Sequence, residues 1–267
     1  MQGRVLVVAG SDSGGAAGIQ ADIKTITALG AYAMTAITAL TAQNSRGVFG
    51  VHAVPVDFIA RQMQLVLDDY GADVVKTGML HATEVIETVC ATLDGAAAGL
   101  PLVADPVMFA KGGDALLDTA AIGALRALLL PRAYLLTPNR REAELLAGCP
   151  IDSVDDLRRA AERLLELGPS AVLVKGGHLD GETVSDVLLS RDGEQVFTHT
   201  RVASVHTGGT GCSLASAIAS GLAQRLVLAD AVRRGLDYVQ QAIVSAPGFG
   251  GGRGPVDHAH TVQPFGV

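Results

Sequence analysis

A glycine-rich turn that ends in a cysteine is the part of this sequence best suited to chemistry. Residues 208–212 read Gly-Gly-Thr-Gly-Cys, and the small apolar residues after them predict a helix. The first amides of a helix have no partner within it and carry the positive end of its dipole. Glycines let an anion approach these amides, and a thiol there is biased toward the thiolate. The segment therefore predicts an anion site beside a candidate base, Cys212; a plain helix start with a buried cysteine is the alternative.

A second glycine-rich loop lies near the N-terminus, between an apolar strand and a helix. It runs from Gly10 to Gly18, and Asp22 follows on the first helical turn. Glycines leave room for a flat ring to approach the backbone, so the loop predicts one wall of a substrate pocket with Asp22 facing it. A flexible connection between strand and helix is the alternative.

Oxygen-bearing and basic side chains follow three later strands. Asn139 and Glu142 have the spacing of a capping box, and their oxygens also suit a hydrated magnesium ion near phosphates. Asp105 ends another strand, Lys175 precedes two glycines, and Lys111 lies in a glycine-flanked loop that could close over phosphate. Solvated loop lysines and a simple helix cap are the alternatives.

The elements that must position these residues alternate along the chain. Residues 5–9 form a continuous apolar run, which is typical of a strand buried on both faces. The polar residues stand mostly at strand ends, where open parallel sheets bind ligands. The pattern predicts an α/β fold with a mostly parallel sheet. Further strands are expected at 32–40, 73–76, 102–104, 133–136 and 171–174, a small hairpin at 183–200, a last helix from about 228, and an irregular tail from about 248.

Composition narrows the class of protein. The 267 residues are 49% hydrophobic, which suits one domain spanning 1–267. A net charge of −7, the absence of Trp and only 4% aromatic residues argue against nucleic acid or an anionic membrane as a partner. We expect no membrane span and no signal peptide. Three cysteines without paired spacing make a disulfide framework or zinc site improbable and favour the cytoplasm.

Taken together and in this order, the motifs resemble the ribokinase-like kinases. Within them, the chain is similar to the hydroxymethylpyrimidine/phosphomethylpyrimidine kinases of thiamine biosynthesis. Sugar kinases of this superfamily carry Asp where Cys212 stands. The resemblance spans about residues 5–260 and rests on residues 9–12, 18–24, 39–44, 76–80, 105–108, 137–139, 174–178 and 209–212.

The resemblance implies a three-layer α/β/α fold, ATP and Mg²⁺ as cofactors, a pyrimidine alcohol as substrate, two successive phosphorylations and a homodimer. Cys212 corresponds to the family's catalytic base. The anion hole corresponds to Gly209, Thr210 and Gly211. The substrate pocket corresponds to Gly10, Thr41, Gln43, Met79 and Val107, beside the Asp22 expected from the loop. Lys175 corresponds to the nucleotide site, and Asn139 and Glu142 correspond to residues that would meet magnesium through water. Asp105 and Lys111 are added to the nucleotide site from their positions at a strand end and in a glycine-flanked loop.

Two positions depart from the family pattern. Ala16 stands where a third glycine is usual, which is unfavourable if that residue needs a positive φ. Gly208 stands where the family has histidine, which puts nucleotide contacts of that loop in question. Two other functions fit the same residues: a pyridoxal kinase, and a non-catalytic pyrimidine-binding protein that kept the fold.

Overall fold

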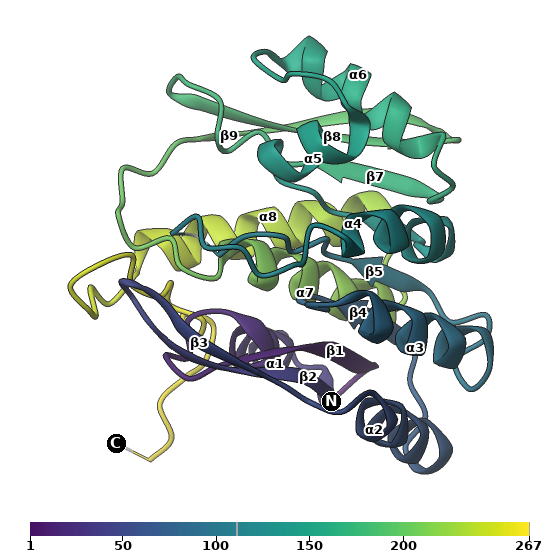
Figure 1. Cartoon of the computed structure of the whole chain (residues 1–267). Coiled ribbons are helices and arrows are strands. Elements are labelled where there is room, and N and C mark those ends of the chain that lie inside the picture. The colour runs from purple at the N-terminus through teal and green to yellow at the C-terminus, as the bar shows by residue number, and fades with distance from the viewer. Residues whose placement is uncertain (111, 267) are drawn as a thin grey trace.

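One sheet organises the chain (Figure 1). The computed structural model describes residues 1–110 and 112–266. The strands of these residues are β1 (Arg4–Asp12), β2 (Tyr32–Asn44), β3 (Gly47–Ala53), β4 (Val74–Thr77), β5 (Leu102–Ala104), β6 (Leu135–Leu136), β7 (Ala171–Val174), β8 (Thr183–Ser190) and β9 (Gly193–Thr200). They lie in the order β3-β2-β1-β4-β5-β6-β7-β8-β9. Pairing is parallel from β2 to β7, whereas β3, β8 and β9 pair antiparallel.

Helices cover both faces of the sheet, as Figure 1 shows. They are α1 (Gly18–Ala28), α2 (Val56–Asp69), α3 (Thr83–Asp94), α4 (Ala121–Ala124), α5 (Arg140–Ala147), α6 (Val154–Leu165), α7 (Thr210–Ala223) and α8 (Leu228–Val244). Along β1, Val5 and Val7 pack in one core cluster with α1, α7 and α8. Leu6 and Val8 point to the other face and pack in a second cluster with α2, α3, α5 and α6. A strand buried on both faces needs apolar residues at every position, which explains the continuous run at 5–9. The predicted fold class is confirmed.

Two local predictions differ from the structure. The second strand continues past residue 40 and turns back into β3, whose residues are mostly exposed and lack an alternating pattern. The spacing of Ile122, Leu125 and Leu129 predicts a helix, but the structure has only four α-helical residues there before a π-helical turn at Leu125–Leu129. The predicted hairpin is present as β8 and β9.

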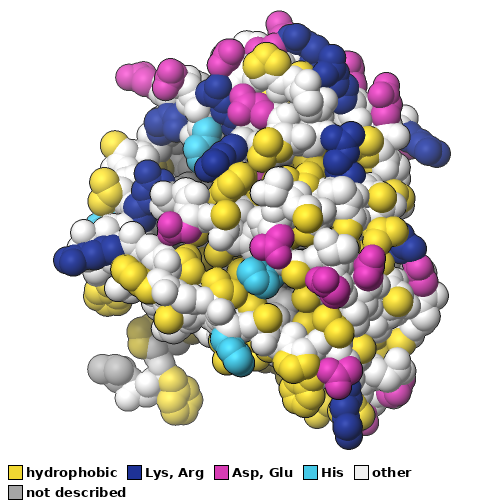
Figure 2. All heavy atoms as spheres, in the orientation of Figure 1, with side chains coloured by type: hydrophobic (Ala, Val, Ile, Leu, Met, Phe, Trp, Pro, Cys, Tyr) yellow, Lys and Arg dark blue, Asp and Glu magenta, His cyan; other side chains and the backbone are white. Residues whose placement is uncertain are grey.

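The carboxyl ends of the parallel strands meet at one edge of the sheet. Asp12 ends β1, Asp105 follows β5 and Lys175 follows β7. The tail after α8 returns to this edge, where Gly208 pairs with Pro255 ahead of α7. Charges of both signs are interspersed over the face in Figure 2. Within the described residues, no helix has the length and apolar character needed to cross a bilayer.

Candidate active site

A single carboxylate organises the loop after β1. Asp12 is almost fully buried, and its carboxylate accepts the amides of Gly14 (2.8 Å), Ala16 (3.0 Å) and Ala17 (2.8 Å). The left-handed positions of the loop fall on Gly15 (φ 73°) and Gly18, while Ala16 lies outside that region. The alanine at position 16 therefore introduces no backbone strain.

This loop joins the two halves of the candidate site. On one side, the Ser13 hydroxyl donates to the Gln43 carbonyl and accepts the Gln43 amide, each at 2.9 Å. On the other side, the loop lies directly against Gly209: a Cβ added there would fall 1.8 Å from the Ala16 carbonyl oxygen. The tertiary fold thus brings the two glycine-rich segments of the sequence into contact.

The start of α7 has the form expected of an anion site. Gly209 is the N-cap residue with φ 82°, and among the described residues no side chain caps this helix. The Thr210 hydroxyl donates to the Thr207 carbonyl (3.2 Å) rather than to the helix start. The first amides of α7 are therefore left for an external acceptor.

We expect Gly209→Ala to lower kcat about 10²-fold and to cost roughly 1–3 kcal/mol of stability. The added methyl group would meet the Ala16 carbonyl, and alanine does not readily adopt φ 82°. Steady-state kinetics and urea unfolding measure the two effects. Gly123→Ala is the matched control, because that glycine has open space around it and no positive φ. An unchanged kcat in Gly209→Ala would contradict the close contact.

Cys212 lies within the first turn of α7, and the residue as a whole is of intermediate exposure. Burial raises its pKa to about 12, and Asp22 and Asp105 act in the same direction. Lys76 and the amide of Gly18, which points at the sulfur, lower the pKa but do not offset the burial. The expectation that the helix start favours a thiolate is therefore wrong for the free protein: the thiol keeps its proton at neutral pH.

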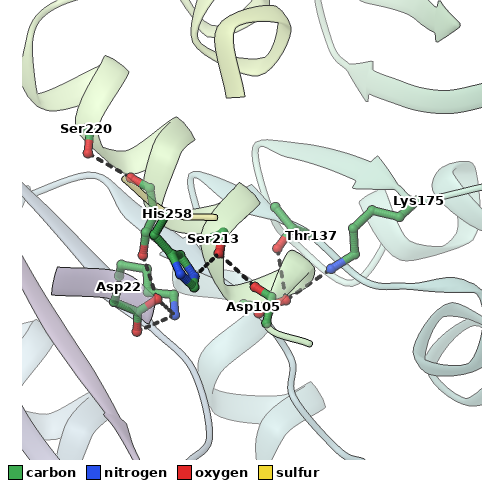
Figure 3. Close-up of polar contacts among 10 residues, drawn as sticks. Asp22, Asp105, Thr137, Lys175, Ser213, Ser220 and His258 are labelled. Atoms are coloured by element: carbon green, nitrogen blue, oxygen red, sulfur yellow. Dashed lines mark hydrogen bonds and ion pairs between the residues drawn. The ribbon is translucent and has the colours of Figure 1, made fainter. Parts of the chain in front are cut away.

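Asp22 lies beneath the site instead of on its wall. Its carboxylate (labelled in Figure 3) and the Lys76 ammonium are both fully buried and lie 2.9 Å apart. The Ser216 hydroxyl donates to the same carboxylate at 2.7 Å. Burial lowers the pKa of Lys76, but Asp22 with Cys212 and Asp105 outweighs it, so the net shift is upward. Sequence reasoning missed this role of Lys76, although a lysine in the apolar strand 74–77 was a usable signal.

The residues expected to hold the substrate lie together. A Cβ on Gly10 would fall 2.9 Å from the Met79 sulfur, and Met79 and Val107 belong to one small apolar cluster. The Thr41 hydroxyl lies 3.1 Å from the Gln43 side-chain oxygen and 3.0 Å from the Ser11 carbonyl. These contacts give an apolar wall with polar groups at its edge, as a heteroaromatic ring with polar substituents requires.

A lysine and an aspartate meet at the opposite side of the α7 start. Asp105 accepts the Thr137 hydroxyl at 3.2 Å and the Lys175 ammonium at 3.3 Å (Figure 3). A Cβ on Gly211 would lie 3.4 Å from the Lys175 nitrogen, so this ammonium stands beside the anion site. Lys111, the other lysine predicted for phosphate, lies outside the described residues.

Asn139 and Glu142 form a capping box at the start of α5. The Glu142 amide donates to the Asn139 side chain (3.0 Å), and the Asn139 amide donates to the Glu142 carboxylate (2.9 Å). Burial raises the pKa of Glu142 to about 7; Lys175 opposes this and Asp105 reinforces it. Lys175 thus forms an ion pair with Asp105, and its charge also acts on Glu142.

Gly208, the second position that departs from the family pattern, is explained by its contacts with the C-terminal tail. Its amide donates to the Gly254 carbonyl at 2.9 Å, and a Cβ on Gly208 would lie 2.9 Å from that oxygen and 3.0 Å from the Arg253 carbonyl. A side chain at position 208 would displace the tail from this path.

Comparison with known proteins identifies the family. The family model described as phosphomethylpyrimidine kinase matches residues 12–257. The hydroxymethylpyrimidine/phosphomethylpyrimidine kinase of Streptomyces coelicolor is 50% identical over 254 residues, 95% of this chain and 93% of that protein. The Escherichia coli protein of the same name is 43% identical over 96% of this chain and 97% of its own length.

Solved structures agree with these sequence matches. The ADP complex of Bacillus subtilis pyridoxal kinase has a TM-score of 0.90 at 33% identity, covering 97% of this chain and 98% of that chain. Phosphomethylpyrimidine kinase from Clostridium difficile 630 has a TM-score of 0.80 at 42% identity, covering 90% of this chain and 99% of that chain. The mostly parallel sheet with helices on both faces, together with these matches, defines a kinase of the ribokinase-like class. More narrowly, the chain belongs to the phosphomethylpyrimidine kinase family.

Proposed function

We propose that this enzyme transfers the γ-phosphoryl group of ATP to the hydroxymethyl group of 4-amino-5-hydroxymethyl-2-methylpyrimidine, and then phosphorylates the monophosphate to the pyrophosphate. These steps supply the pyrimidine half of thiamine diphosphate. The observation that carries the proposal is the juxtaposition at the α7 start, where an uncapped helix and Cys212 lie beside the Lys175–Asp105 pair.

In this proposal the chain mainly positions reactants and neutralises charge, which is what phosphoryl transfer requires. The amides of Thr210, Gly211 and Cys212 receive the transferring phosphoryl group, and Lys175 binds nucleotide phosphate. Gln43 binds the aminopyrimidine ring against Met79. Each well-placed amide is worth about 3–4 kcal/mol of barrier lowering.

In the ternary complex the Cys212 thiol first releases its own proton to solvent, and the thiolate so formed then accepts the proton of the substrate hydroxyl. Because the pKa of the thiol is high in the free protein, this first deprotonation depends on bound ligands. Asp105 is one of the groups that raise the pKa of Cys212, so a cation held beside Asp105 would favour the thiolate. Lys76 acts in the same sense from below.

Magnesium fits this edge only as a largely hydrated ion. Among the described residues, no group of three or more His, Cys, Asp or Glu side chains is arranged to hold a metal. Asp105 and Glu142 supply hard oxygen atoms, and Mg²⁺ characteristically keeps several waters and phosphate ligands beside one or two carboxylates. When bound with ATP, it would neutralise charge on the phosphates; Asn139 and Glu142 would meet it through water.

Pyridoxal is a second candidate substrate, because the pyridoxal kinase from Staphylococcus aureus, solved twice in complex with pyridoxal, shares this fold at TM-scores of 0.89 and 0.88. A coupled assay of ADP release, run with magnesium and with each alcohol in turn, tests the proposal. We expect the pyrimidine alcohol and its monophosphate to be turned over with a higher kcat/KM than pyridoxal. Preference for pyridoxal would support the second candidate, and binding without turnover would support a non-catalytic pyrimidine-binding protein.

A cytoplasmic homodimer is part of the proposal. The three cysteines are free, as a reducing compartment favours. The edge strand β3 exposes Phe49 and Val51, and neighbouring β2 exposes Leu40. Apolar edge strands are normally covered, and a second copy of the chain would cover this one.

A further inference from the structure

A histidine of the C-terminal tail reaches the helix that carries the anion site. His258 is only 5% exposed, and its Nε2 lies 3.1 Å from the Ser213 hydroxyl of α7 (Figure 3). Ser213 is fully buried and follows Cys212 directly in the sequence. The tail is therefore in direct contact with the first turn of α7, although neither residue was singled out by the sequence motifs.

The contact continues from Ser213 to the peptide that begins the helix. The Ser213 hydroxyl donates to the Gly209 carbonyl at 2.9 Å, and the Ser213 amide donates to the same carbonyl at 2.9 Å. Because the Ser213 hydroxyl donates its hydrogen to the Gly209 carbonyl, its oxygen acts as the acceptor toward His258. This arrangement selects the His258 tautomer with the hydrogen on Nε2, which donates to the Ser213 oxygen. Burial, followed by the charge of Lys24, lowers the pKa of His258 to about 4, so the imidazole is neutral at neutral pH.

The Gly209 carbonyl and the Thr210 amide belong to one planar peptide unit, and in a trans peptide they point in opposite directions. Two donors that hold this carbonyl inward therefore aim the Thr210 amide outward, toward the anion site. Gly209 has no side chain to restrict its own rotation. The orientation of this amide then depends on the groups that hold the carbonyl.

We propose that His258 is a positioning residue for phosphoryl transfer: through the Ser213 hydroxyl it fixes the Gly209–Thr210 peptide and so aims one amide of the anion hole. The role rests on the proposed function of the α7 start. The backbone of His258 is in turn held by α8, because the Tyr238 hydroxyl donates to the His258 carbonyl at 2.6 Å. The tail thereby becomes a part of the active-site architecture.

The test compares His258→Phe, His258→Gln, Ser213→Ala and the His258→Phe/Ser213→Ala double variant of the full chain. Removing one such donor outright costs about 10²–10³-fold in kcat, and a misaimed donor should cost part of that, about 10–100-fold. We expect His258→Phe and Ser213→Ala each to show this loss with little change in the KM for the pyrimidine alcohol. His258→Gln, whose amide can donate to the serine, should recover most of kcat. The double variant should be no slower than Ser213→Ala.

His260→Phe is the matched control. His260 belongs to the same tail; its Nε2 lies 3.0 Å from the Tyr238 carbonyl, and its ring lies 4.7 Å from the Tyr238 ring at an interplanar angle of 38°. It should keep kcat. An equal loss in this control would show that only tail anchoring matters and would overturn the proposal, as would additive losses in the double variant or full kcat in His258→Phe. If His258→Phe does not fold, Ser213→Ala and His258→Gln decide the matter.

A readout independent of turnover separates this inference from the proposed function. The ¹H–¹⁵N resonance of the Thr210 amide should shift in His258→Phe and Ser213→Ala and stay near its wild-type position in His258→Gln. If the wild-type protein turned over none of the candidate alcohols, the proposed function would be refuted, but the Thr210 resonance would still test the positioning of the peptide. An unmoved Thr210 resonance in an otherwise active enzyme would refute the positioning role alone.

Discussion

Replacement of Cys212 by alanine is expected to lower kcat about 10²–10⁴-fold, the usual cost of losing a general base. The KM values should change little, because the alanine leaves the α7 amides, Lys175 and the substrate wall in place. Steady-state kinetics with the pyrimidine alcohol and magnesium measures the effect. Cys149→Ala is the matched control, since Cys149 is a buried cysteine in the turn after α5.

The protonation state of Cys212 sharpens this prediction. Because burial raises the pKa of the thiol to about 12, iodoacetamide should label Cys212 slowly at neutral pH in the free protein. Mass spectrometry after timed labelling measures the rate. Fast labelling would show a thiolate in the resting enzyme, against the electrostatics of the site. Full kcat in Cys212→Ala would instead remove the base and leave catalysis to positioning and charge neutralisation.

Replacement of Lys76 by methionine is expected to destabilise the protein by about 3–5 kcal/mol, because it leaves the buried Asp22 carboxylate without its partner. Urea unfolding measures the loss. Removing both charges in Lys76→Met/Asp22→Asn should cost less than the single change, since the desolvation of an unpaired charge is then avoided. A single variant as stable as wild type would show that the ion pair contributes nothing net.

The pH dependence of the Lys76→Met variant follows from linkage. Burial raises the pKa of Asp22 above the 3.8 of an ordinary aspartate, and loss of the lysine removes the main group that opposes this shift. The folded variant then binds a proton that the unfolded chain has released, so its stability falls as the pH rises above 3.8. The variant should therefore be closest to wild type in mildly acidic buffer, and unfolding at several pH values measures the difference. An equal loss at every pH would exclude an unpaired Asp22 as the cause.

The order of elements and the chemistry-bearing residues could be predicted from the sequence, because both depend on local patterns. The apolar run at 5–9 predicted a strand covered on both faces, and the polar residues at strand ends predicted one functional edge. Strand β3 could not be predicted in this way, since most of its side chains face solvent and alternate little. The capping-box geometry of Asn139 and Glu142 was also a local matter and was anticipated.

Tertiary packing decided which of these groups are charged and which act together. Asp22 pairs with a lysine 54 residues away, and Ser213 meets a histidine 45 residues away; no local spacing encodes either contact. The same burial that pairs Asp22 also keeps the proton on Cys212, against the expectation from its helix position. Residue types and their order are written along the chain. Desolvation and long-range pairing arise only when remote segments exclude water from one another.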